Sequence, residues 1–226
     1  MLRSFQLLLL LIIGGVTVLA PAADAPILKQ GDKIVFLGDS ITAGASGPTG
    51  FISLIKKALD EKHKDWKIET VNAGVSGNEI NNLQARVEKD VIAKKPNLVF
   101  IYIGINDVWH HPQPDKEKFE AGLKEIIGKM TAINAHVILC TPTVIGEKTG
   151  GANPKDKHLD ELSDVSRKVA KDLSLSVCDL RVAFVDSLKE KNKDNKDKGV
   201  LTGDSVHLNA EGNKLVAEQM LKALGQ

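Results

Sequence analysis

Short apolar runs alternate with longer amphipathic segments along most of this chain, and this alternation is the strongest constraint on its fold. The apolar runs predict strands at residues 33–37, 67–71, 98–103, 137–140 and 176–178. The amphipathic segments predict helices near residues 51–61, 79–93, 116–133, 157–173 and 210–224. Strands that alternate with helices of this length form parallel sheets with helices on both faces. We therefore expect an α/β protein.

The first residues have the composition of an export signal. A positive charge at Arg3 precedes the apolar residues 7–13, and Ala20-Pro21-Ala22 offers small residues for cleavage. We interpret residues 1–22 as a signal peptide and residues 23–226 as a single domain. The alternative is an uncleaved anchor, although two glycines break this short apolar stretch. We expect an exported protein, periplasmic or secreted, without stable membrane insertion after cleavage.

The charge balance argues against two classes of partner. The chain has 30 Lys and Arg against 29 Asp and Glu, a formal net charge of +1. Without a basic excess, electrostatics give no reason to expect a nucleic-acid or anionic-membrane partner. The charged residues 189–198 alternate in sign and are typical of a solvated loop.

The two cysteines, Cys140 and Cys178, each lie near the end of a predicted strand. Their spacing fits neither a zinc site nor a redox pair. A chain of this length can fold without a disulfide, so two buried free thiols are the simpler interpretation. An exported protein also permits a disulfide between them, which stays the alternative.

Small and polar residues follow three successive predicted strands. Gly-Asp-Ser at 38–40 follows the first strand, Asn-Ala-Gly at 72–74 the second, and Gly-Ile-Asn-Asp at 104–107 the third. Each group alone could be a turn or a helix cap. In open α/β sheets, however, ligands bind outside the carboxyl ends of the strands. The coincidence at three strand ends favours a shared site.

A fourth polar group, Asp-Ser-Val-His at 204–207, supplies partners for the Ser40 hydroxyl. Serine is a weak nucleophile near neutral pH and needs a base, a role that histidine suits. An Asp three residues before the His can bind the far ring nitrogen and fix the tautomer. We predict a serine esterase in which Ser40 is the nucleophile, His207 the base and Asp204 its orienting acid.

Ester cleavage also needs donors for the negative oxygen of the tetrahedral intermediate. Our candidates for this oxyanion hole are the N–H groups of Ser40 and Gly74 and the side-chain amide of Asn106. Just beyond Asn106, Trp109 and His110 are candidate substrate contacts at the rim. The alternatives there are plain packing for Trp109 and a surface loop for His110.

These four groups, in this order, resemble the signature blocks of the SGNH hydrolases, also called the GDSL esterase/lipase family. The blocks are Gly38-Asp39-Ser40-Ile41, Gly74 in Asn72-Ala73-Gly74, Gly104-Ile105-Asn106-Asp107 and Asp204-Ser205-Val206-His207. The resemblance implies a flavodoxin-like three-layer α/β/α sandwich with a five-stranded parallel sheet. It also implies the catalytic and oxyanion roles given above. The one departure is Ile41 in place of Leu, an apolar exchange that affects no catalytic group.

In this chemistry Ser40 attacks an ester carbonyl, and the acyl-enzyme is then hydrolysed by water. We expect no metal and no cofactor, and a small-molecule or polysaccharide ester as substrate. Short-chain esters, especially O-acetylated carbohydrates, are our first choice. A lysophospholipase or thioesterase-type acyl hydrolase and an acyltransferase are alternatives that use the same acyl-enzyme. A non-catalytic carbohydrate-binding module on the same scaffold is the alternative from another class. Oligomeric state does not follow from the sequence.

Overall fold

The computed structural model describes residues 27–226, so the predicted signal peptide and the domain boundary at residue 23 lie outside the described residues. Five parallel strands form one sheet in the order β2-β1-β3-β4-β5. The strands are β1 (Lys33–Gly38), β2 (Glu69–Gly74), β3 (Leu98–Tyr102), β4 (His136–Cys140) and β5 (Ser176–Cys178). This order is that of flavodoxin-like folds, in which the switch of direction beside β1 opens a crevice at the carboxyl ends.

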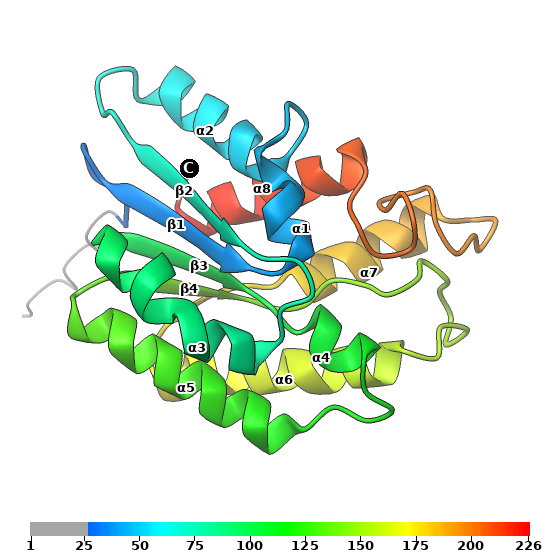
Figure 1. Ribbon diagram of the computed structural model, residues 1–226. Helices are drawn as coiled ribbons and strands as arrows, with labels where there is room; N and C mark the ends of the chain where they lie inside the picture. The colour runs from blue at the N-terminus through cyan, green and yellow to red at the C-terminus, as the bar shows by residue number, and fades with distance from the viewer. Residues whose placement is uncertain (1–26) are drawn as a thin grey trace, which may run out of the picture.

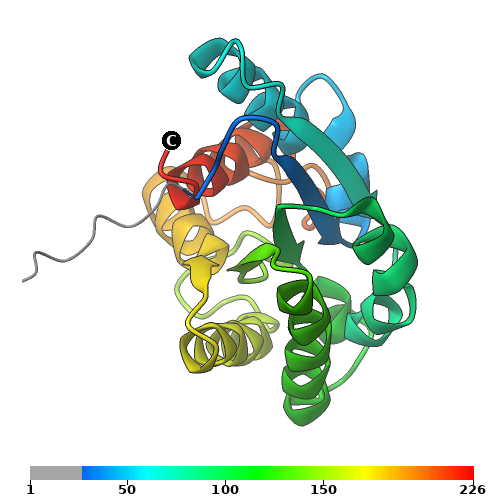
Figure 2. The same ribbon diagram turned by 90° about the vertical axis from the view of Figure 1, so that its left-hand side faces the viewer.

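Helices cover both faces of the sheet, as Figure 2 shows end-on. The helices α2 (Phe51–Lys62), α7 (Leu180–Lys191) and α8 (Ala210–Ala223) lie on one face. On the other face lie α3 (Ile80–Asp90), α5 (Lys116–Ala132) and α6 (Asp156–Asp172). Short helices α1 (Ser40–Ala43) and α4 (Ile105–Trp109) follow β1 and β3 at the carboxyl edge of the sheet (Figure 1), with 3₁₀ turns at Gly44–Ser46 and Ile92–Lys94. The three layers and the parallel sheet confirm the predicted fold class.

The central strands are buried on both faces. Every residue of β3 is buried, as its apolar sequence predicts. The ring of Phe36 on β1 stacks on that of Phe100 on β3, with centroids 5.3 Å apart, and meets Phe51 of α2 edge-on at 6.1 Å. This packing fixes β1 between α2 and β3, and β1 leads directly to Ser40.

Among the longer elements, two differ clearly from the sequence prediction. Strand β2 was expected at residues 67–71, but Lys67 has a left-handed backbone (φ 50°) and lies outside the strand. The strand instead continues to Gly74, because its pairing with β1 extends to the end of that strand. Helix α7 was not predicted, and the residues expected to begin a solvated loop at 189 complete it. Only Leu180, Phe184 and Leu188 give it a regular apolar spacing.

Cys140 and Cys178 are both free and buried, which confirms the simpler of the two predictions. They occupy paired positions on the neighbouring strands β4 and β5. Burial raises the pKa of the Cys140 thiol well above its usual value, so the thiol form is favoured. From Ile27 onward, none of the helices is both long enough and apolar enough to cross a membrane.

Candidate active site

Ser40 is placed by a sharp turn from β1 into α1. Asp39 is the N-cap of α1: its buried carboxylate accepts a hydrogen bond from the Ile41 N–H at 2.9 Å. Ser40 is the first residue of the helix, and its side chain is half-buried at the carboxyl edge of the sheet. The two sequence interpretations of this motif, a helix cap and a site residue, therefore hold for different residues. Asp39 caps the helix, and Ser40 faces the site.

The predicted triad residues meet in a continuous chain of hydrogen bonds. The Ser40 Oγ lies 2.9 Å from Nε2 of His207, and Nδ1 of His207 lies 2.8 Å from Oδ2 of Asp204. The other carboxylate oxygen of Asp204 accepts the backbone N–H groups of Val206, at 3.1 Å, and His207, at 2.7 Å. The loop between α7 and α8 thus reaches back to α1 (Figure 1).

The Asp204 carboxylate is held in its charged form. Its partial burial raises the pKa, but hydrogen bonds from the imidazole and backbone of His207 and from the Val206 N–H outweigh this effect and lower the pKa to about 2. An ionised carboxylate at Nδ1 favours the tautomer whose Nε2 can accept a proton from Ser40. The side chains of Asp204 and His207 are 57% and 44% exposed, so this proton-transfer chain opens directly to solvent.

The structure does not leave Gly74 free to serve as an oxyanion donor. Its N–H donates to Oδ1 of Asn72 at 2.9 Å, and the Asn72 amide donates in turn to the carbonyl of Thr42 at 2.8 Å. A side chain at Gly74 would overlap the backbone of Thr42 and Ala43. Gly74 is therefore needed for close packing of β2 against α1, and the prediction of a free donor at this position is corrected.

Gly77, which the sequence motifs did not single out, has the exposure and the unengaged N–H that were expected of Gly74. It lies in a tight turn closed by a hydrogen bond from the Asn78 N–H to the Val75 carbonyl at 3.3 Å, and its φ of +77° favours glycine. Gly77 is exposed, and within residues 27–226 its N–H has no acceptor. The same holds for the N–H of Ser40. The available signal was a second glycine three residues beyond Gly74, in Ser76-Gly77-Asn78.

Asn106 lies beside this turn. It is buried on α4, and its side-chain amide donates one hydrogen to the carbonyl of Asn78 at 3.0 Å. This bond fixes the amide group against the turn that holds Gly77. An amide nitrogen carries two hydrogens, so the second is available to a substrate oxygen.

Two buried carboxyl groups flank the site without belonging to the triad. Asp107 accepts the N–H of Ile80 at 3.1 Å, at the start of α3, and the buried Oδ2 atoms of Asp39 and Asp107 have no hydrogen-bond partner in the described chain. Burial raises the pKa of Asp39 to about 7, and the nearby Asp107 charge contributes to the rise. Burial likewise raises the pKa of Asp107 to about 6.

The predicted rim residues Trp109 and His110 differ in their surroundings. Trp109, the last residue of α4, is 45% exposed. His110 and His111 both face the Glu79 carboxylate, with Nδ1 of His110 at 3.4 Å and Nε2 of His111 at 3.0 Å. Among residues 27–226, no cluster of three or more His, Cys, Asp or Glu side chains is arranged to hold a metal ion.

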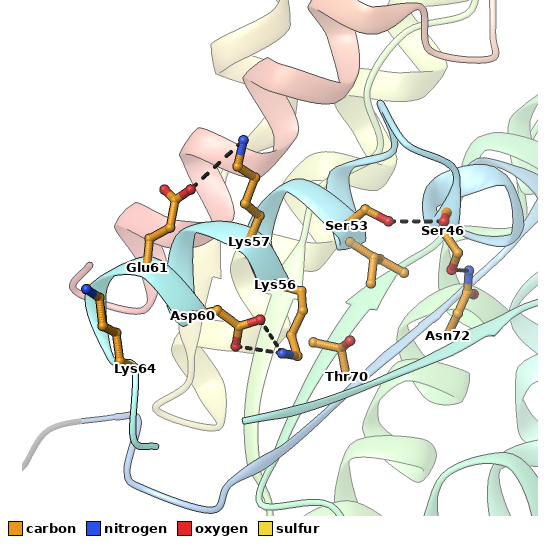
Figure 3. A pocket seen from close by; sticks show the side chains of 10 residues that line it. Ser46, Ser53, Lys56, Lys57, Asp60, Glu61, Lys64, Thr70 and Asn72 are labelled. Carbon is orange, nitrogen blue, oxygen red and sulfur yellow. Dashed lines mark hydrogen bonds and ion pairs between the residues drawn. The ribbon is translucent and has the colours of Figure 1, made fainter. Parts of the chain in front are cut away.

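A cavity of about 590 Å³ lies between α2 and the edge strand β2, and none of the triad residues lines it (Figure 3). On its helix side, Lys56 and Asp60 form a hydrogen-bonded ion pair at 2.6 Å. At the other end, the Asn72 amide donates to the Ser46 hydroxyl at 2.8 Å. The same Asn72 side chain accepts the Gly74 N–H, so this end of the cavity borders the packing of β2 on α1.

A flavodoxin-like sheet with a hydrogen-bonded serine, histidine and aspartate at its carboxyl edge defines a carboxylic ester hydrolase. Residues 36–215 match the model of the GDSL-like lipase/acylhydrolase family, so the chain belongs to this family. The match confirms the resemblance found in the sequence motifs.

Similar proteins of known name are mostly esterases. An acetylxylan esterase of Geobacillus stearothermophilus is 31% identical over 217 residues, which cover 88% of this chain and 96% of that protein. The crystal structure of the acetyl xylan esterase AlAXEase is 40% identical, with a TM-score of 0.81, and covers 84% of this chain and 98% of that chain. An uncharacterised lipoprotein of Bacillus subtilis is 23% identical over 83% of this chain and 87% of its own length.

Proposed function

We propose that this protein is an exported serine esterase that removes short acyl groups, chiefly acetyl, from carbohydrate hydroxyls. The observation that carries the proposal is the unbroken hydrogen-bond chain from the Asp204 carboxylate through His207 to the Ser40 hydroxyl. Such a chain converts a weak nucleophile into a competent one. The N-terminal composition and the lipoprotein relative support export.

In the proposed reaction, Ser40 Oγ attacks the ester carbonyl while Nε2 of His207 accepts its proton. The N–H groups of Ser40 and Gly77 and the free amide hydrogen of Asn106 stabilise the oxyanion. His207 then protonates the leaving alcohol, which leaves an acyl group on Ser40. Water, deprotonated by His207, attacks the acyl group and restores the free serine. The ionised Asp204 stabilises the imidazolium in both halves.

Variants of one relative support these roles. Solved structures of the Geobacillus stearothermophilus acetylxylan esterase include catalytic mutants in which an Asp, a His three positions later, or a Ser is replaced by Ala. Asp204 and His207 have the same three-residue separation, and Ser40 also precedes them in the chain.

The solvent exposure of the triad favours a substrate ester whose alcohol part is bulky. A solvent-facing His207 can reach an ester that projects from a large molecule, as an acetyl group projects from a polysaccharide. The exposed indole of Trp109 could stack on the apolar face of a sugar ring, which aromatic side chains do well. The names of the acetylxylan esterase relatives point to the same substrate class.

We expect p-nitrophenyl acetate to be cleaved fastest in a series of acetate, butyrate, octanoate and palmitate esters. Ser40→Ala should lower kcat on the order of 10⁴-fold or more, because the nucleophile is lost. Ser53→Ala, which removes the hydroxyl of a half-buried serine on α2, is the matched control and should keep full activity. Acetate release from acetylated xylo-oligosaccharides then tests the carbohydrate assignment.

Other results would change the assignment. Undiminished turnover in Ser40→Ala would refute the nucleophile, and a rate maximum at octanoate would favour a lipid or thioester substrate. Transesterified product in the presence of acceptor alcohols would indicate an acyltransferase. No turnover of any ester, together with binding of xylo-oligosaccharides, would indicate a carbohydrate-binding module.

A further inference from the structure

Glu147 is a buried carboxylate that the proposed reaction does not use. It lies in the loop after β4 and is fully buried. Removing a carboxylate from water is costly unless several hydrogen-bond donors surround it. Glu147 meets this need with backbone N–H groups and one hydroxyl rather than with a cation.

All of these donors come from three consecutive residues. Oε1 of Glu147 accepts the Leu201 N–H at 2.7 Å and both the N–H and the hydroxyl of Thr202, the latter at 2.7 Å. Oε2 accepts the Val200 N–H at 2.8 Å. Hydrogen bonds to an ionised acceptor are stronger than neutral ones. Glu147 therefore fixes both the position and the direction of residues 200–202.

The fixed segment is one side of the hairpin that carries Asp204 and His207. Thr202 forms an antiparallel bridge with Leu208, and the Gly203 N–H donates to the His207 carbonyl at 2.8 Å. The catalytic imidazole is thus attached to a strand-like pair whose other member is bound to Glu147. A shift of Thr202 would move His207 with it.

The tip of the same hairpin is also held. Ser205 has a left-handed backbone (φ 84°), which costs energy for a residue with a side chain. Its carbonyl accepts the N–H of Gly146, the neighbour of Glu147, at 2.7 Å, and its hydroxyl donates to Asp197 at 2.8 Å. The Glu147 N–H donates to the Asp197 carbonyl at 2.8 Å, so both contacts of Ser205 lead back to the Glu147 segment.

We propose that Glu147 is a positioning residue for ester hydrolysis: through Thr202, it holds the Asp204–His207 hairpin within proton-transfer distance of Ser40. The inference rests on the proposed function, in which His207 takes the Ser40 proton. Glu147 makes no contact with substrate in this assignment. Its loss should therefore lower kcat much more than it changes KM, since a misplacement of about 1 Å can cost about 10²-fold in rate.

The test compares Glu147→Ala and Glu147→Gln with Asp179→Asn. Asp179 is a partial control: its carboxylate also accepts a backbone N–H, that of Val182, and a threonine hydroxyl, that of Thr141, but it lies at the start of α7 and binds the Arg167 guanidinium as well. The measurements are kcat and KM for p-nitrophenyl acetate, the thermal midpoint, and the low-field proton resonance of the His207 Nδ1–H. All activities are measured well below each variant's thermal midpoint.

We expect Glu147→Ala to lower kcat on the order of 10²-fold and Glu147→Gln to lower it less. Glutamine keeps an acceptor for Leu201 and Thr202 but turns an NH₂ group toward the Val200 N–H. KM should stay within about twofold, and the low-field resonance should weaken or disappear. Asp179→Asn should lower the thermal midpoint while keeping kcat and the resonance.

If Glu147→Gln lowers the thermal midpoint but leaves kcat and the resonance unchanged, Glu147 has a purely structural role and the proposal is wrong. Glu147→Gln also decides the question if Glu147→Ala does not fold. A failure of the proposed function would appear separately, as turnover that survives Ser40→Ala. The resonance reports the geometry of the hairpin without depending on turnover.

Discussion

Gly74 and Gly77 lie three residues apart and are required for different physical reasons. Gly74 leaves room for the backbone of Ala43 in α1, and any side chain would overlap it. Gly77 has open space around the position of a side chain but a positive φ of 77°. A side chain is therefore sterically excluded at Gly74, whereas at Gly77 it would strain the backbone.

We expect Gly74→Ala to lower the free energy of unfolding more than Gly77→Ala does. Gly77→Ala should cost about 1 kcal/mol, the usual penalty of a left-handed residue with a side chain, and should lower kcat by disturbing a proposed oxyanion donor. Gly74→Ala should cost several times more because α1 must move. Urea denaturation and kcat of both variants provide the measurement. Equal losses of stability would contradict this division of roles.

Loss of the Asp39 proton should lower the free energy of unfolding as the pH rises. Its folded pKa of about 7 lies above its ordinary value of 3.8, so the folded state binds a proton that the unfolded state has released between these values. The stabilisation is present below pH 4 and is lost as the pH approaches 7. Because one pKa unit corresponds to about 1.4 kcal/mol, the loss between pH 5 and pH 8 should be about 3 kcal/mol.

Denaturation of the wild type and Asp39→Asn at both pH values measures this contribution. Asparagine can still accept the Ile41 N–H, so the cap is kept while the titration is removed. Asp115→Asn, at the exposed cap of α5, is the control and should keep the wild-type pH dependence. An unchanged pH dependence in Asp39→Asn would show that Asp39 does not titrate as expected.

The sequence identified most of the candidate site because chemistry restricts which residues can do this work. Ser40, Asp204 and His207 were predicted from their reactive groups and spacing, and the structure brings them into contact. Whether the Gly74 N–H is free could not be predicted in this way. It depends on which N–H is engaged by a neighbouring side chain, here Asn72, and that is a property of three-dimensional contacts.

At the scale of elements, α3 links the strand ends through one side chain. The Arg86 guanidinium donates to the carbonyls of Gly38 on β1, at 2.8 Å, and Ala73 on β2, at 2.9 Å. It also donates to the side-chain oxygen of Asn78 at 2.6 Å, beside the turn that contains Gly77. The planar fork of an arginine suits three separate acceptors. Helix α3 thereby sets the spacing between the nucleophile turn and the glycine turn.

We expect Arg86→Lys to lower kcat by about tenfold, because a single ammonium group cannot reach all three acceptors. Arg167→Lys is the matched control, since Arg167 binds Asp179 and Asp164 away from these turns. It should lower the thermal midpoint but keep kcat. Steady-state kinetics and thermal melting of both variants supply the comparison, and equal kcat values would argue against a role for α3 in the site.

At the scale of the whole molecule, the alternation of apolar runs and amphipathic segments was sufficient to predict the layers and the parallel sheet. It could not predict helix α7, because apolar and charged residues are mixed on both faces of that helix: Arg181 is buried and Val182 is exposed. Nor could it predict the conformation of the loop between α7 and α8. That loop is held by Glu147 from another part of the chain, and local sequence carries no sign of such a contact.

The hydrogen bond between Ser40 and His207 joins residues 167 positions apart in the chain. Closing so long a loop carries a large entropic cost, and contacts of high sequence separation slow the folding of a domain. Ser40 therefore has no base until the segment that carries His207 packs beside α1. Catalytic competence depends on this long-range contact, and the recovery of turnover during refolding would report when it forms.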